Sequence, residues 1–141
     1  MKDFEYCINI VLKFEGGFVD NPQDPGGATK YGISQRAYPS LDIKNLTIEQ
    51  AKIIYKMDYW NKAGCENMAW PMNLLILDTS VNLGVSKAID LIYDAPDWRD
   101  YLLRRINKYM DIVNRDNTKK LFLRGWLNRV MGLYEIIKRI S

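Results

Sequence analysis

Glu15 is the residue best placed for chemistry, because it stands where an apolar helical pattern meets Gly16 and Gly17. It follows Ile8 by seven residues and Val11 by four, so helical geometry predicts a carboxyl on the apolar face. In a last helical turn, the negative end of the helix dipole disfavours a second negative charge. Both effects favour the neutral acid, the form that can protonate the leaving-group oxygen of a glycoside. The alternative is a glutamate that turns into solvent.

Short polar side chains follow Glu15 in a loop that could fold back over it. Asp24 could hold a water, stabilise positive charge on a sugar ring or act as a nucleophile, and Thr29 could orient that water. Asp20 supplies a further short polar side chain in the same loop. The alternative is ordinary turn chemistry, because Asp-Pro-Gly-Gly is a good turn former.

The composition excludes several other chemistries. The chain has no histidine and two cysteines, which excludes Ser-His-Asp and Cys-His nucleophiles and the usual zinc sites. The glycines of PGGATKYG, residues 25–32, lack the spacing of a phosphate-binding loop. If the protein is an enzyme, we expect carboxylates to carry the chemistry without a metal or cofactor. We expect Cys7 and Cys65 to be reduced packing residues.

Apolar residues recur at helical spacing along most of the chain, which predicts a single, mainly α-helical domain. Thr47 and Gln50 have the spacing of a capping box, and the segment after Pro71 is apolar on nearly every side, as in a central buried helix. The predicted helices cover about residues 4–15, 47–59, 72–83, 86–94, 98–113 and 126–140, and an irregular loop with a short hairpin near residues 29–34 follows the first.

The 141 residues, 48% of them apolar, suit one globular domain with its own core. No run approaches the ~20 apolar residues that a membrane-spanning helix needs. The N-terminal residues MKDFEYC lack the apolar region of a signal peptide, so we expect synthesis in the cytoplasm.

Charge is unevenly distributed along the chain. Residues 1–98 hold 9 Lys and Arg against 13 Asp and Glu, a net charge of −4, whereas residues 99–141 hold 11 against 4, a net charge of +7. A basic C-terminal third suggests an anionic partner such as nucleic acid or cell wall. The alternative is a solvated helix face.

Four stretches of the chain resemble one family. The sequence EGGFVDNPQDPGGATKYGIS, residues 15–34, closely resembles the N-terminal signature of glycoside hydrolase family 108, the N-acetylmuramidases of phage and prophage lysis cassettes. IYKMDYW, LDTSVNLG and FLRGWLNRV resemble later segments, the last of them in the associated predicted peptidoglycan domain. The resemblance covers nearly the whole chain. It implies a lysozyme-like fold in which residues 1–84 form the catalytic part and residues 85–141 pack on it as helices.

The resemblance also assigns roles to residues. It makes Glu15 the catalytic acid, Asp24 the second polar group and Thr29 the residue in the phage-lysozyme role. The gap between Asp24 and Thr29 is one residue shorter than in phage-type lysozymes, and Phe18 replaces the commoner tyrosine.

Aromatic and polar residues elsewhere could line a sugar groove. Tyr31, Tyr59 and Trp60 could stack on pyranose faces, and the alternative for each is packing in the core. Asp78 and Asn82 lie four residues apart on one face of the central helix, where they either brace the active-site loop or reach the cleft.

Two hypotheses of different class follow. The first is a phage or prophage endolysin, an N-acetylmuramidase that cleaves the β-1,4 bond between N-acetylmuramic acid and N-acetylglucosamine. For it we expect a monomer that binds peptidoglycan glycan strands, without nucleic acid or membrane insertion, and that reaches the wall through a holin. The second is a non-catalytic helical module that binds peptidoglycan or nucleic acid. In both, Trp126, Asn128 and Arg129 are expected to be structural.

Overall fold

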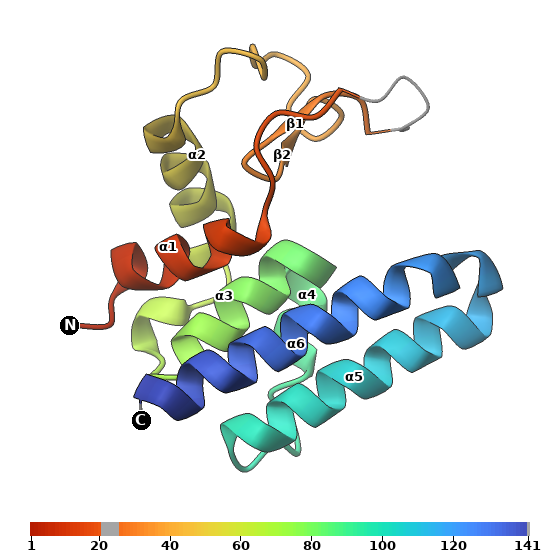
Figure 1. The fold of residues 1–141 in the computed structure, drawn as a ribbon. Helices are drawn as coiled ribbons and strands as arrows, with labels where there is room; N and C mark the ends of the chain where they lie inside the picture. The colour runs from red at the N-terminus through yellow and green to blue at the C-terminus, as the bar shows by residue number, and fades with distance from the viewer. Residues whose placement is uncertain (21–25, 141) are drawn as a thin grey trace.

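The computed structural model describes residues 1–20 and 26–140. Its elements are arranged as a mainly α-helical, lysozyme-like domain, as the sequence predicts (Figure 1). In chain order they are α1 (Phe4–Phe14), β1 (Thr29–Lys30), β2 (Ile33–Ser34), α2 (Ile48–Tyr55), the π-helix η1 (Lys56–Trp60), the 3₁₀ turn η2 (Cys65–Asn67), α3 (Met72–Leu83), α4 (Val85–Asp90), α5 (Trp98–Arg115), the 3₁₀ turn η3 (Asn117–Lys119) and α6 (Lys120–Ile140).

Helix α1 begins at a side-chain cap and buries one face. The Asp3 carboxylate accepts the backbone N–H of Tyr6, which satisfies one of the free donors at the helix start. Four residues at helical spacing are buried against the core: Cys7, Ile8, Ile10 and Val11. This burial fixes the direction in which the chain leaves the helix after Phe14.

A short hairpin follows α1. Strands β1 and β2 are antiparallel, with Thr29 opposite Ser34 and Lys30 opposite Ile33. The two residues between them, Tyr31 and Gly32, have φ angles of 52° and 81°. A positive φ at both central positions is the pattern of a tight turn whose twist matches that of the strands. The hairpin expected near residues 29–34 is therefore confirmed.

The capping box predicted at the start of α2 is present. The Thr47 hydroxyl accepts the N–H of Gln50, and the Gln50 side chain accepts the N–H of Thr47. The helix continues as the π-helix η1 as far as Trp60, so the helical stretch ends one residue later than expected and changes its hydrogen-bonding pattern after Tyr55.

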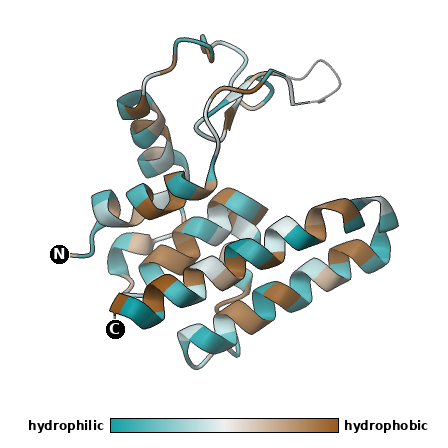
Figure 2. Cartoon of the chain, in the orientation of Figure 1, coloured by the Kyte–Doolittle hydropathy of each residue, from teal (hydrophilic) through white to brown (hydrophobic). Residues whose placement is uncertain are grey.

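Helix α3 is the centre of the molecule. It spans the predicted residues and ends at Gly84, and residues 73–80 are all buried. It packs against α1, α4 and α5 (Figure 1). In Figure 2, hydrophobic colour dominates α3, whereas α5 and α6 carry hydrophobic and hydrophilic residues on different faces. The fully apolar pattern in the sequence thus reflects neighbours on several sides.

Helices α5 and α6 form a long antiparallel pair joined by η3 (Figure 1). Asp97 caps α5 by accepting the N–H groups of Arg99 and Asp100. The basic C-terminal third of the sequence is this helix pair, and it lies beside α3 rather than apart from it.

Cys7 and Cys65 are free and buried, so both pack in the core as expected. Within residues 1–20 and 26–140, none of the helices combines the length and the apolar character needed to cross a membrane.

Two glycines inside α6 provide a test of its packing. A Cβ at Gly125 would meet no atom within 4 Å, whereas a Cβ at Gly132 would lie 3.0 Å from the Phe14 ring. We expect Gly125→Ala to raise the free energy of unfolding by about 0.5–1 kcal/mol, because alanine loses less backbone entropy in a helix. Gly132→Ala is the matched control, and it should lower the free energy of unfolding because its Cβ would crowd the Phe14 ring. Urea unfolding measures both, and equal gains would contradict the close approach of α6 to Phe14.

Candidate active site

Glu15 lies one residue beyond the end of α1. Its backbone is extended (φ −91°, ψ 145°), and its N–H donates to Leu12 O at 3.2 Å. The expectation that Glu15 occupies the last helical turn is therefore wrong, because the chain leaves the helix after Phe14. The extrapolation from Ile8 and Val11 does not apply to its side chain. That side chain is 19% exposed, so it is sheltered but reachable from solvent.

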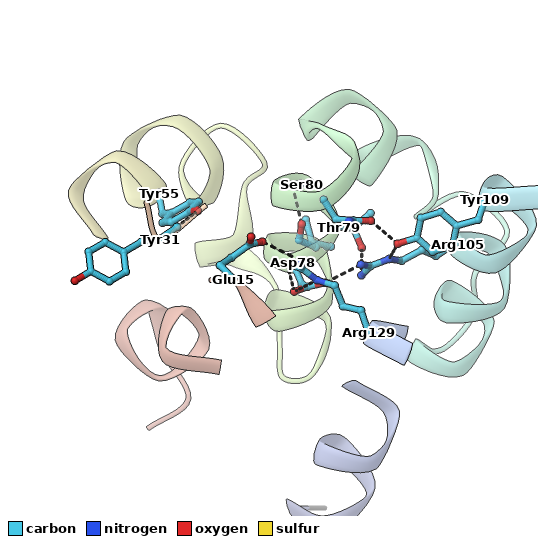
Figure 3. Close-up of polar contacts among 11 residues, drawn as sticks. Glu15, Tyr31, Tyr55, Asp78, Thr79, Ser80, Arg105, Tyr109 and Arg129 are labelled. Atoms are coloured by element: carbon cyan, nitrogen blue, oxygen red, sulfur yellow. Dashed lines mark hydrogen bonds and ion pairs between the residues drawn. The ribbon is translucent and has the colours of Figure 1, made fainter. Parts of the chain in front are cut away.

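The immediate neighbour of the Glu15 carboxyl is a cation. Arg129 Nη1, from α6, donates to Glu15 Oε1 at 2.9 Å (Figure 3). The same guanidinium donates to Asp78 from Nε at 3.1 Å to each carboxylate oxygen, and from Nη2 at 2.9 Å. Arg129 therefore bridges the two carboxylates. From the sequence, Arg129 is expected to be a structural residue, and no local pattern links it to Glu15, 114 positions away.

Asp78 is fully buried, and a second arginine neutralises it. Arg105 Nη2 lies 2.8 Å from Asp78 Oδ2, and both side chains are 0% exposed. Burial alone would raise the pKa of Asp78, but the guanidinium charges of Arg105 and Arg129 outweigh burial and lower the pKa. A carboxylate without access to solvent cannot touch a glycan, so the structure favours bracing, and the expected substrate-binding role of Asp78 is not supported.

The network continues into α5 and back to α3. Arg105 donates to Thr79 Oγ1 at 3.0 Å and to Tyr109 Oη at 2.8 Å. The Tyr109 hydroxyl in turn donates to Asn82 Oδ1. Asn82 thus supports the arginine through Tyr109, which is again the bracing alternative.

Arg129 also keeps its charge. Burial would lower the pKa of Arg129, but the carboxylates of Asp78 and Glu15 raise it above the usual range. Two guanidiniums therefore face two carboxylates, and the cluster is neutral when all four groups are ionised. This balance makes burial of the cluster tolerable.

Gly132 allows α6 to pack closely enough on Phe14 for Arg129 to reach Glu15. Gly132 lies three residues after Arg129, on the same side of the helix. Its Cα faces the ring of Phe14, and the Arg129 guanidinium lies 5.3 Å from the same ring centroid. Because Phe14 immediately precedes Glu15, the packing of the Phe14 ring against α6 also affects the distance between Arg129 and Glu15.

The hairpin turn closes the other side of Glu15. The Tyr55 hydroxyl donates to Tyr31 O at 2.6 Å and holds the turn against α2 (Figure 3). Gly32 is so close that an ideal Cβ on it would lie 2.9 Å from Glu15 Oε2. Burial raises the pKa of Tyr55, and the Glu15 carboxylate raises it further, so the hydroxyl stays protonated.

Of the other two predicted catalytic residues, the structure describes only Thr29. Asp24 falls outside the described residues. Thr29 is in β1, where its backbone exchanges two hydrogen bonds with Val19, at 2.7 and 2.8 Å. Both assignments remain predictions.

The three predicted sugar-stacking residues differ in position. Trp60 is 1% exposed, donates to Glu66 Oε2 at 2.8 Å and packs edge-on against Phe4, so a sugar cannot stack on it and that prediction is wrong. Tyr59, in η1, is half-buried, and its ring centroid lies 5.4 Å from that of Tyr55. The ring of Tyr31 is half-buried and points away from Glu15 in Figure 3.

Comparison with known proteins gives one family and one fold. The model of the family described as Glycosyl hydrolase 108 matches residues 8–84 of the 141. Among solved structures, the structure of Brucella abortus SagA matches with a TM-score of 0.78 and 23% identity, over 96% of this chain and 94% of that chain. At that identity the match shows a shared fold. The search of curated proteins finds no match.

Arg129 should be important for stability as well as for the site. Arg129→Met leaves buried Asp78 with one guanidinium, and we expect it to lower the free energy of unfolding by about 3 kcal/mol or more. The control is Arg124→Met in the exposed part of the same helix, for which the change should stay within about 0.5 kcal/mol. Urea unfolding measures both variants. Similar values for the two would show that the bridge contributes nothing to folding.

The lowered pKa of Asp78 predicts how its contribution depends on pH. The pKa in the folded protein is below the ~3.9 of an unfolded aspartate, so the unfolded state binds the proton first. The contribution of the ionised Asp78 carboxylate to stability is complete above about pH 4. It is lost as the pH falls through the pKa of Asp78 in the folded protein. The difference in unfolding free energy between wild type and Asp78→Asn should therefore be constant from pH 7 to about 5 and shrink below about 4. A difference that grows in acid would contradict the ion-pair assignment.

Proposed function

This chain belongs to the glycosyl hydrolase 108 family, a family of peptidoglycan hydrolases, and from this premise we propose that it is an N-acetylmuramidase. It would hydrolyse the β-1,4 bond between N-acetylmuramic acid and N-acetylglucosamine. Its substrate is the glycan strand of the cell wall, and the role proposed for it is that of a phage or prophage endolysin. It acts as a monomer on the wall after release from the cytoplasm through a holin.

The observation that supports this proposal is the setting of the Glu15 carboxyl. It is sheltered, 19% exposed, and held on one oxygen by Arg129 at 2.9 Å. A glycosidase needs a carboxyl in a fixed position that can protonate the leaving oxygen. Once Glu15 has given up its proton, the resulting carboxylate is stabilised by a guanidinium already in contact with it.

The Arg129 contact with Glu15 is compatible with both forms of the carboxyl. A protonated Glu15 can still accept the Arg129 hydrogen bond through its carbonyl oxygen. Protonation therefore changes the charge of the site by one unit without breaking the contact that positions the acid.

Asp24 is proposed as the second polar group, which stabilises the oxocarbenium-like transition state or positions the attacking water. Thr29 is proposed to orient that water from β1. The sequence signature supports both roles, and the location of Thr29 two residues before the Tyr31–Gly32 turn agrees with a place near Glu15.

The basic C-terminal helices fit the same function. Of their 11 Lys and Arg, Arg105 and Arg129 are already paired with Asp78 and Glu15. The others give the helix pair a residual positive charge that favours an anionic wall polymer. A pure binding module would gain nothing from a carboxylate held at the site, which is why the enzyme is preferred.

Glu15→Gln tests the proposal. Glutamine keeps the size of the side chain and an oxygen that can accept from Arg129, so the protein should stay folded, but it has no transferable proton. We expect glycan release from purified cell walls to fall by about 10²–10⁴-fold.

The matched control is Glu66→Gln, because the Glu66 carboxylate accepts a hydrogen bond from Trp60 in a different pocket. Its activity should stay within about twofold of wild type. If the wild-type protein binds walls without releasing glycan, the binding-module alternative replaces the enzyme. If Glu15→Gln keeps more than about half of the activity, another residue is the acid.

A further inference from the structure

The two oxygens of the Glu15 carboxyl have different surroundings. Oε1 accepts from Arg129 Nη1 at 2.9 Å. Oε2 faces the hairpin turn, where an ideal Cβ on Gly32 would lie 2.9 Å from it and 3.0 Å from Glu15 Cδ. The same Cβ would lie 2.4 Å from Tyr55 Oη. The space that a Cβ on Gly32 would need is thus bordered by both the carboxyl and the Tyr55 hydroxyl.

The proton of the neutral acid belongs on Oε2. A guanidinium nitrogen only donates, so an O–H on Oε1 would bring two hydrogens face to face. With the proton on Oε2, Oε1 remains an acceptor for Arg129 and the existing contact is kept. The oxygen that delivers the proton is therefore the one beside Gly32.

Any side chain at position 32 would displace this oxygen. The Tyr55 ring is 1% exposed and its hydroxyl is fixed to Tyr31 O at 2.6 Å, so it can move little. The Glu15 carboxyl is the end of a flexible side chain and is the group that would give way. Such a shift would disturb its contact with Arg129.

We propose that Gly32 is a positioning residue for the proposed glycosidase reaction, with its bare Cα holding Glu15 Oε2 in place and leaving room for the glycosidic oxygen to reach it. In that step the proton passes from Oε2 to the glycosidic oxygen, which keeps the electron pair of the broken C–O bond. Water then adds to the anomeric carbon and releases a proton to solvent. This inference rests on the function proposed above.

The competing explanation for Gly32 is backbone conformation, because its φ of 81° favours glycine in any case. Gly64 separates the two explanations. Its φ is 73°, and a Cβ there would meet nothing within 4 Å. Gly64→Ala therefore carries a similar backbone strain without any contact with the site.

The experiment compares Gly32→Ala with Gly64→Ala on a soluble glycan fragment. Both should lower the melting temperature. We expect kcat of Gly32→Ala to fall about 10- to 100-fold, with KM within about twofold, because a misplaced catalytic group lowers turnover more than binding. Gly64→Ala should keep kcat within about twofold of wild type. Equal kcat values for the two variants would overturn the inference.

A second pair of variants covers the case in which Gly32→Ala does not fold. Tyr55→Phe removes the atom that the new Cβ meets at 2.4 Å and leaves the contact with Glu15. Gly32→Ala/Tyr55→Phe should therefore fold better than Gly32→Ala, yet turn over about 10-fold or more slower than Tyr55→Phe alone. Equal turnover of these two proteins would also reject the inference.

A crystal structure of the alanine variant gives a readout that does not depend on activity. The Glu15 Oε1 to Arg129 Nη1 distance should exceed hydrogen-bond range in the variant, and an unmoved carboxyl would reject the positioning role. Failure of the proposed function looks different. It would appear as a wild-type protein that releases no glycan, while the displacement of Glu15 could still be observed.

Discussion

The Arg129 guanidinium is the group on which the site depends, because it binds a fully buried carboxylate and a partly exposed one at once. Its contacts with Asp78, through Nε and Nη2, fix the plane of the fork. With that plane fixed, the remaining nitrogen, Nη1, points toward Glu15, whose Oε1 lies 2.9 Å away. A planar, bidentate cation is what this arrangement requires, and lysine, with one nitrogen, could not bridge the two acids in the same way.

The burial of Asp78 explains how the helices are assembled around that contact. An unpaired buried carboxylate is strongly unfavourable, so α3 must be met by cations from α5 and α6. Arg105 and Arg129 provide them, and the pairing of α5 with α6 brings both arginines to one point. The position of the proposed acid thus follows from the pairing of the buried Asp78, because the arginine that neutralises Asp78 also holds Glu15.

Local features of the fold could be predicted from the sequence, and long-range features of the site could not. The capping box at Thr47 and the apolar run of α3 are short-range patterns, and both predictions are confirmed. Arg129 could be expected to be structural, but nothing near it in sequence indicates a partner 114 positions away. The prediction for Trp60 failed because an aromatic residue after a helix fits a core and a sugar groove equally well.

The geometry also bears on where the catalytic part of the chain ends. The family match ends at residue 84, and the predicted division of the domain falls at the same place. Yet Glu15 is held by a residue of α6, and Asp78 is neutralised by residues of α5 and α6. Residues 1–84 alone would contain both acids and neither arginine, leaving Asp78 as an uncompensated charge at the centre of the core. The two C-terminal helices therefore contribute directly to the candidate site.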